Sequence, residues 1–123
     1  VIETREVKNL VVDDGLEYIA DRMKNNSTVM SHMAIGTGST AAAASDTALG
    51  TEAARQALTS TTVTANAVAY VASFAAGTGT GAITEAGILN AASGGTLLCR
   101  TVFSVVNKGA SDSMTITWTI TIS

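Results

Sequence analysis

The stretch that decides the fold is MTITWTITI, residues 114–122. Large apolar side chains alternate in it with threonines, without interruption. Successive side chains of a β-strand point to opposite faces, so this strand has one apolar face and one face of threonine hydroxyls and methyls. The alternation predicts a strand that packs its apolar face into a core.

The segments before it show the same kind of structure, with Gly, Ser and Asn marking the turns. Ala65-Asn66 predicts a tight hairpin turn, and residues 108–112 predict the loop before the last strand. Several short strands joined by such turns predict an antiparallel β-sandwich of the jelly-roll or immunoglobulin-like kind. The other predicted strands are 29–35, 57–64, 67–74, 83–89 and 96–106.

One segment, residues 13–26 (DDGLEYIADRMKNN), predicts an α-helix packed on the sheets. Four apolar residues recur in it at helical spacing and define one face. Asp14, followed three residues later by Glu17, resembles a capping box. Residues 1–12 are expected to form an arm or an edge strand, and residues 1–123 a single domain that is mainly β with one N-terminal helix. The apolar face consists of Leu16, Ile19, Ala20 and Met23.

Composition excludes several function classes. The net charge is −3 and basic residues never cluster beyond a pair, so no nucleic-acid partner is expected. No apolar run reaches the ~20 residues of a membrane span, so no membrane association is expected. Cys99 is the single cysteine, which rules out a disulfide within the chain. The first ten residues carry charges where a secretory signal would be apolar, so we expect a complete chain made in the cytoplasm.

The sequence offers little for catalysis. Gly36-Thr37-Gly38 follows a predicted strand, but Ala41 replaces the third glycine of a dinucleotide motif and the lysine of a P-loop is absent. We therefore interpret Gly36 and Gly38, like Gly94 and Gly95, as turn glycines that permit positive φ. His32 has no ligand partner at metal spacing. We expect no catalytic residue, metal or cofactor and no small-molecule substrate.

Charged residues are few, and four of them are expected to form structural ion pairs: Glu85, Arg55, Arg100 and Glu52. An acid and an arginine within apolar strands satisfy each other, and the planar guanidinium suits this role. Glu85 can pair with either Arg55 or Arg100. The less favoured alternative is a pair of carboxylates that act in acid–base catalysis. Cys99 is expected to be a small core residue.

The order of several short motifs resembles that of small β-rich virion proteins of tailed bacteriophages, over residues 29–122. More distantly, residues 33–100 are similar to the N-terminal, baseplate-attaching domain of P2-like tail fibre (collar) proteins. A fibre protein would continue into a long shaft, whereas this sequence ends at Ser123, directly after the last predicted strand. We therefore expect a stand-alone subunit. The motifs are AIGTG (34–38), DTAL (46–49) with Glu52 and Arg55, ITEAGILN (83–90), GTLL (95–98) and RTVF (100–103).

The resemblance implies a non-enzymatic virion subunit that decorates or cements the capsid, bound to the major capsid protein or another virion protein. A homo-oligomer, such as a trimer, is expected, because the chain has no proline and its strands carry few charges to protect their edges. The alternatives are a tail fibre or baseplate subunit and a small cell-surface or receptor-binding module. An enzyme is the least favoured reading.

Overall fold

The structure is a computed structural model that describes residues 10–122, and within this range it contains one helix and eight strands. Residues 1–9 of the predicted arm therefore lie outside the described residues, and Leu10–Val11 form the first strand. The elements are β1 Leu10–Val11, α1 Asp13–Arg22, β2 His32–Gly36, β3 Glu52–Ala57, β4 Ser60–Thr64, β5 Ala67–Phe74, β6 Gly81–Leu89, β7 Leu97–Lys108 and β8 Met114–Thr121.

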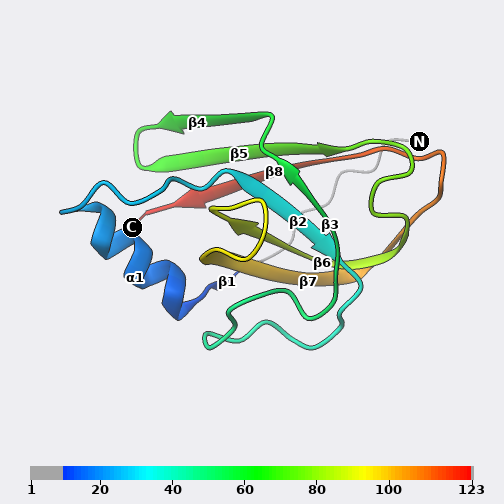
Figure 1. Cartoon of the computed structure of the whole chain (residues 1–123), viewed down its shortest axis with the longest axis horizontal. Coiled ribbons are helices and arrows are strands. Elements are labelled where there is room, and N and C mark those ends of the chain that lie inside the picture. Colours follow the sequence, from blue (N-terminus) through cyan, green and yellow to red (C-terminus); the bar gives the residue numbers. More distant parts are fainter. Residues whose placement is uncertain (1–9, 123) are drawn as a thin grey trace.

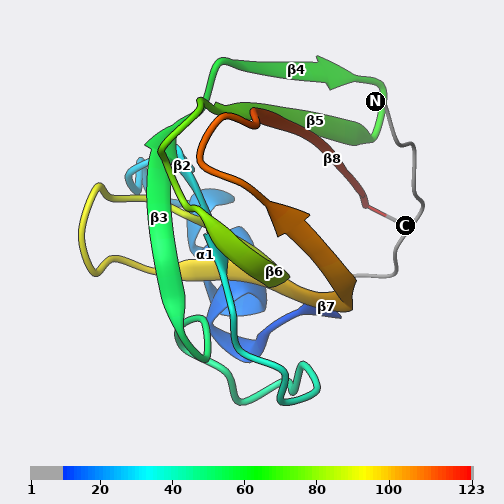
Figure 2. The same cartoon turned by 90° about the vertical axis from the view of Figure 1, so that its right-hand side faces the viewer.

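The strands form two antiparallel sheets (Figure 1). The five-stranded sheet has the order β1-β7-β6-β2-β3, and the three-stranded sheet has the order β4-β5-β8. Every described pairing between neighbouring strands is antiparallel. In Figure 2 the three-stranded sheet lies above the strands of the five-stranded sheet. The prediction of a mainly β chain with antiparallel sheets and one helix is confirmed.

Both sheets contribute to one apolar core, and β8 enters it as its alternation predicts. Trp118 and Ile120 are buried, and Met114 and Ile116 pack against the same cluster. The threonines of β8 are exposed on the opposite face. The cluster includes Met33, Ile35, Ala86 and Ile88 from the five-stranded sheet and Ala72, Phe74, Trp118 and Ile120 from the three-stranded sheet.

The predicted strand 57–64 is wrong in its first part, because the chain changes sheets within it and only Ser60–Thr64 forms the strand β4. Leu58 N donates to Ser31 O beside the five-stranded sheet, whereas Thr59 N donates to Val71 O of β5. The crossing separates β3 from β4, and β3 begins before the predicted segment. The hairpin turn is found as predicted, with Ala65 at a φ of +53°. The other strands match the predicted ones with shifted ends, and β5 matches its prediction at both ends.

The helix is shorter than predicted, and of its predicted apolar face Ile19 packs against the core. The helix ends at Arg22. Leu16 and Met23, expected in the buried face, are 56% and 86% exposed. Gly15 is the buried residue instead. The helix backbone lies so close to β7 at this position that a Cβ would be 2.1 Å from the backbone oxygen of Leu98. The capping box is also absent, since Val12 is the N-cap and makes no side-chain cap hydrogen bond.

Candidate functional site

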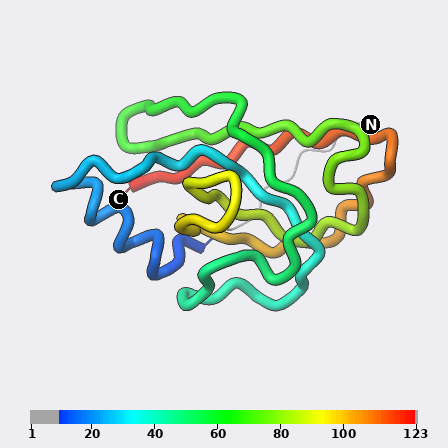
Figure 3. The backbone as a smooth tube through the Cα atoms, viewed as in Figure 1, coloured from blue at the N-terminus to red at the C-terminus, as the bar shows by residue number. Residues whose placement is uncertain are grey.

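The loop of residues 37–51, between β2 and β3, covers the face of the five-stranded sheet that lies away from the three-stranded sheet. In Figure 3 it is the blue-green segment along the lower edge of the molecule. Its base is closed by a hydrogen bond of 2.9 Å from Thr37 N to Thr51 O. Apart from Asp46 its side chains are uncharged, and most are small and exposed. A loop of this composition needs other residues to hold it in place.

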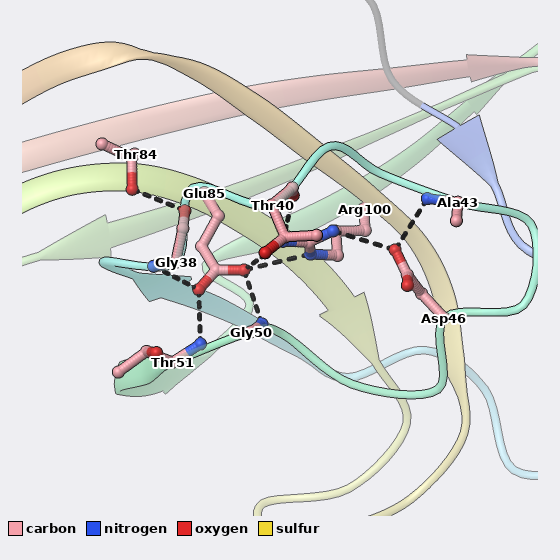
Figure 4. Close-up of polar contacts among 9 residues, drawn as sticks. All are labelled: Gly38, Thr40, Ala43, Asp46, Gly50, Thr51, Thr84, Glu85 and Arg100. Carbon is pink, nitrogen blue, oxygen red and sulfur yellow. Dashed lines mark hydrogen bonds and ion pairs between the residues drawn. The ribbon is translucent and has the colours of Figure 1, made fainter.

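Glu85, on β6, binds both ends of this loop (Figure 4). Its side chain is fully buried. Oε2 accepts hydrogen bonds from Gly38 N and Thr51 N, and Oε1 accepts one from Gly50 N, each at 2.7 Å. One carboxylate thus satisfies three backbone N–H groups that lie next to each other only because the loop returns to its starting point.

Arg100, on β7, extends this contact along the loop. Its Nε donates to Glu85 Oε1 at 3.0 Å, its Nη1 to Asp46 Oδ2 at 2.9 Å and its Nη2 to Thr40 O at 2.9 Å. Asp46 Oδ2 also accepts a bond of 2.9 Å from Ala43 N. We refer to Glu85, Arg100 and Asp46 together as the loop anchor.

The environment of Glu85 keeps its carboxyl ionised. Burial raises its pKa, but the N–H groups of Thr51, Gly50 and Gly38 and the side chain of Arg100 outweigh this effect. The pKa therefore lies below its ordinary value. A carboxylate has about four lone-pair sites, and the four hydrogen bonds described above occupy them. This arrangement favours a structural role for Glu85 over that of a general base.

The structure chooses between the two predicted partners of Glu85. It places Arg100 beside Glu85 and pairs Arg55 with Glu52 at 2.7 Å. Arg55 also donates to the carbonyl oxygens of Ala91 and Gly94. Asp46 was missing from the predicted ion pairs. The signal that could have identified it is its position as the one charged residue in the fifteen-residue loop.

The four predicted turn glycines serve two different purposes. Gly94 and Gly95 have φ values of +63° and +80°, as the turn interpretation requires. For Gly36 and Gly38 that interpretation is wrong, because neither has a positive φ. A Cβ at Gly38 would lie 2.4 Å from Glu85 Oε2, and one at Gly36 would lie 2.3 Å from Thr51 O. These two positions need glycine for close approach to the loop and to Glu85.

Two other buried polar groups have local roles. Cys99 is fully buried, and burial raises the pKa of its thiol far above the ordinary value, so the reactive thiolate is scarce. Lys108, which the sequence did not single out, is 3% exposed. Its Nζ donates to Ala75 O at 2.8 Å and Asp112 O at 2.7 Å, which ties two loops together.

The other groups with potential chemistry are His32 and the acidic side chains of the helix. His32 begins β2, and its Nδ1 lies 2.8 Å from Ser31 Oγ. A hollow of about 420 Å³ lies beside α1 and is lined in part by Asp14, Glu17 and Asp21. Among residues 10–122, no three His, Cys, Asp or Glu side chains are placed to hold a metal ion.

The outward face of the three-stranded sheet is the candidate interaction surface. Residues paired across neighbouring strands point to the same side, so the register places Thr117 beside Val71 and Ser60. The face is free of charged side chains, and every residue of β4 is exposed. We call it the outer threonine face; it comprises Ser60, Thr62, Thr64, Ala67, Ala69, Val71, Ser73, Thr115, Thr117, Thr119 and Thr121.

Among the described strands, β4 and β8 are the edge strands of this sheet, because each pairs only with β5. Neither strand contains a lysine or a proline, the residues that commonly protect an edge.

Comparison with known proteins adds no assignment: no family model, curated protein or solved structure matches this chain. Across the described residues, no helix has the length and apolar character needed to cross a membrane.

Proposed function

We propose that this chain is a non-enzymatic structural subunit of a tailed-bacteriophage virion that decorates or cements the capsid surface. Its partners are the major capsid protein, or another virion protein, and further copies of itself. The observation that carries the proposal is the outer threonine face, which is uncharged and bordered by β4 and β8. The motif order given above supplies the link to phage virions.

An uncharged face of small side chains suits contact with another protein. Burying it requires no charge to be removed from water, which would be the costly step in forming an interface. Strand edges without lysine or proline offer backbone groups to a neighbouring chain. Val63 on β4 is 70% exposed and adds apolar area at this edge. A subunit bound to a large assembly gains from these properties.

The finer fold class is part of the proposal. The shared core supports a β-sandwich. The jelly-roll or immunoglobulin-like subtype rests on the sequence pattern alone. In the A-B-E-D sheet of a constant-type immunoglobulin domain, strands B and E pair, and each is the second strand of its hairpin. In this chain β2 pairs with β6, and each is the first strand of its antiparallel pair, β2–β3 and β6–β7.

The test of function is the position and copy number of the protein in purified particles. Particles stripped of their tails should keep this chain at a copy number comparable to that of the major capsid protein, as measured by quantitative mass spectrometry. Recovery of the chain only in the tail fraction would reject the capsid role.

A tail fibre or baseplate subunit is the second candidate. The motifs shared with the fibre domain include Gly38 and Glu85, which are joined by a hydrogen bond from Gly38 N to Glu85 Oε2. That similarity therefore concerns the way the loop is held. A low copy number that stays with isolated tails would favour this candidate.

A further inference from the structure

The two ends of the loop of residues 37–51 are attached to the five-stranded sheet through a single carboxylate. Glu85 holds the backbone of Gly38, Gly50 and Thr51, which lie at both ends of the loop. Arg100 reaches the middle of the loop from the same place. Besides these bonds, Thr84 Oγ1 donates to Gly38 O and Asp13 N donates to Ala44 O.

We propose that this loop is an acid-released strap: protonation of the Glu85 carboxyl detaches residues 37–51 from the five-stranded sheet, while the two sheets stay folded. The proposal does not depend on the virion role. It concerns a conformational device within the fold.

Protonation breaks the attachment because it converts an acceptor of hydrogen bonds into a donor. A proton from solvent on either oxygen removes acceptor sites that the backbone N–H groups use. When Glu85 is neutral, Arg100 on β7 no longer has its ion pair with Glu85. Its ion pair with Asp46, which lies on the loop itself, stays. Glu52, on β3, carries the other carboxylate near the start of that strand and is bound to Arg55. Glu85 is thus the carboxylate of the sheet that binds the loop, and the ion pair of Arg100 with Asp46 is the charged contact that remains after its protonation.

The two sheets have their own source of stability. None of the buried residues in the core between them comes from the loop. The loop contributes Leu49 to a second, smaller cluster with Val12, Ala34, Leu89 and Leu97. Release of the strap would therefore uncover a small apolar patch on the five-stranded sheet.

The direction of the pH effect follows from the lowered pKa of Glu85. A carboxyl whose pKa is lower in the folded state stabilises that state fully above the unfolded value, about 4.3 for glutamate. This contribution disappears as pH falls through the lower, folded-state pKa. The strap is thus attached at neutral pH and is released in acid.

The experiment compares the intact chain with Glu85→Gln, a neutral side chain of similar shape, at neutral pH. A protease that cuts after small residues, such as elastase, reports access to the alanine run of the loop. Amide hydrogen exchange at β5 and β8 reports the folded sheets. We expect cleavage within 41–48 to be at least about tenfold faster in the variant, with exchange at β5 and β8 unchanged. Glu52→Gln is the matched control and should behave like the natural sequence.

A second measurement uses the natural sequence and needs no variant. Amide exchange of Gly38, Gly50 and Thr51 should lose protection as the pH falls below about 4.3, the ordinary pKa of glutamate, after correction for intrinsic rates, while β5 and β8 stay protected. The proposal is overturned if loop and sheets open together, if Glu85→Gln fails to fold, or if the loop stays protected in both experiments.

Discussion

Gly38 shows how a single missing side chain allows a buried carboxylate to bind a loop. A Cβ at this position would lie 2.4 Å from Glu85 Oε2 and 3.0 Å from the Cα of Gly50. The carboxylate does not move easily, because it is held by four hydrogen bonds. The Cα of Gly50 belongs to the backbone, which one of these bonds also holds. The requirement is spatial, since φ at Gly38 is not positive.

We therefore expect Gly38→Ala to lower the free energy of unfolding by about 1–3 kcal/mol. Gly50→Ala is the matched control, because a Cβ there meets its nearest atom, Arg100 Nη2, at 3.4 Å and should cost less. Urea denaturation followed by Trp118 fluorescence measures both. Equal losses in the two variants would contradict the close-approach argument.

Cys99 provides a second test at the residue scale. Its thiol is buried and its pKa is raised, so both exposure and ionisation oppose alkylation. We expect iodoacetamide to label the native chain at least about a thousandfold more slowly than the urea-unfolded chain, because labelling requires unfolding. Raising the pH to that of an ordinary thiol pKa should not close this gap. Fast native labelling would show that β7 opens locally.

At the scale of the elements, α1 illustrates how backbone contact overrides helical periodicity. Its apolar repeat suggests that Leu16 and Met23 face the sheets, yet both are exposed. The helix approaches β7 through Gly15, where the absence of a side chain lets the helix backbone lie against Leu98. Tyr18 and Ile19 then pack against the core.

Gly15→Ala should consequently destabilise the protein, although alanine has a helix propensity about 1 kcal/mol better than that of glycine. The added Cβ would lie 2.1 Å from Leu98 O, a backbone atom. We expect a loss of about 1–3 kcal/mol with faster amide exchange in α1. Leu16→Gln, on the exposed side, should stay within about 0.5 kcal/mol. Stabilisation by Gly15→Ala would refute this packing.

At the scale of the whole molecule, the two faces of the three-stranded sheet differ sharply. The inner face shares the core with the five-stranded sheet, whereas the outer threonine face has no charge to keep other chains away. Natural edge strands commonly carry lysine or proline for that purpose. Self-association through this sheet is the behaviour that the proposed function requires.

Thr117→Lys combined with Thr119→Lys should weaken that association. Both side chains are exposed, so the substitutions place charge on the face without disturbing the core. Sedimentation velocity should show concentration-dependent oligomers of the natural sequence and a dissociation constant at least about tenfold higher for the double variant. Ser111→Lys, in the loop before β8, is the control for added charge. A natural chain that stays monomeric would argue against the assembly.

The sequence by itself determined the parts of the fold that depend on local patterns. The alternation in residues 114–121 assigned each side chain of β8 to a face, and the Ala65-Asn66 turn located the β4–β5 hairpin. Strand period and turn chemistry are properties of neighbouring residues, so one sequence is enough to recognise them. It also indicated that Glu85 pairs with an arginine, because the chain holds few charges.

Only the tertiary structure decided which distant residues meet. Glu85 contacts Arg100 because β6 pairs with β7, and it reaches Gly38 because β6 also pairs with β2. Asp46 joins them through a loop whose course follows no periodic pattern. The sheet order, the face that α1 turns to the protein and the need for glycine at position 38 follow from contacts across the fold. Spacing along the chain does not encode such contacts, because the register between strands brings these residues together.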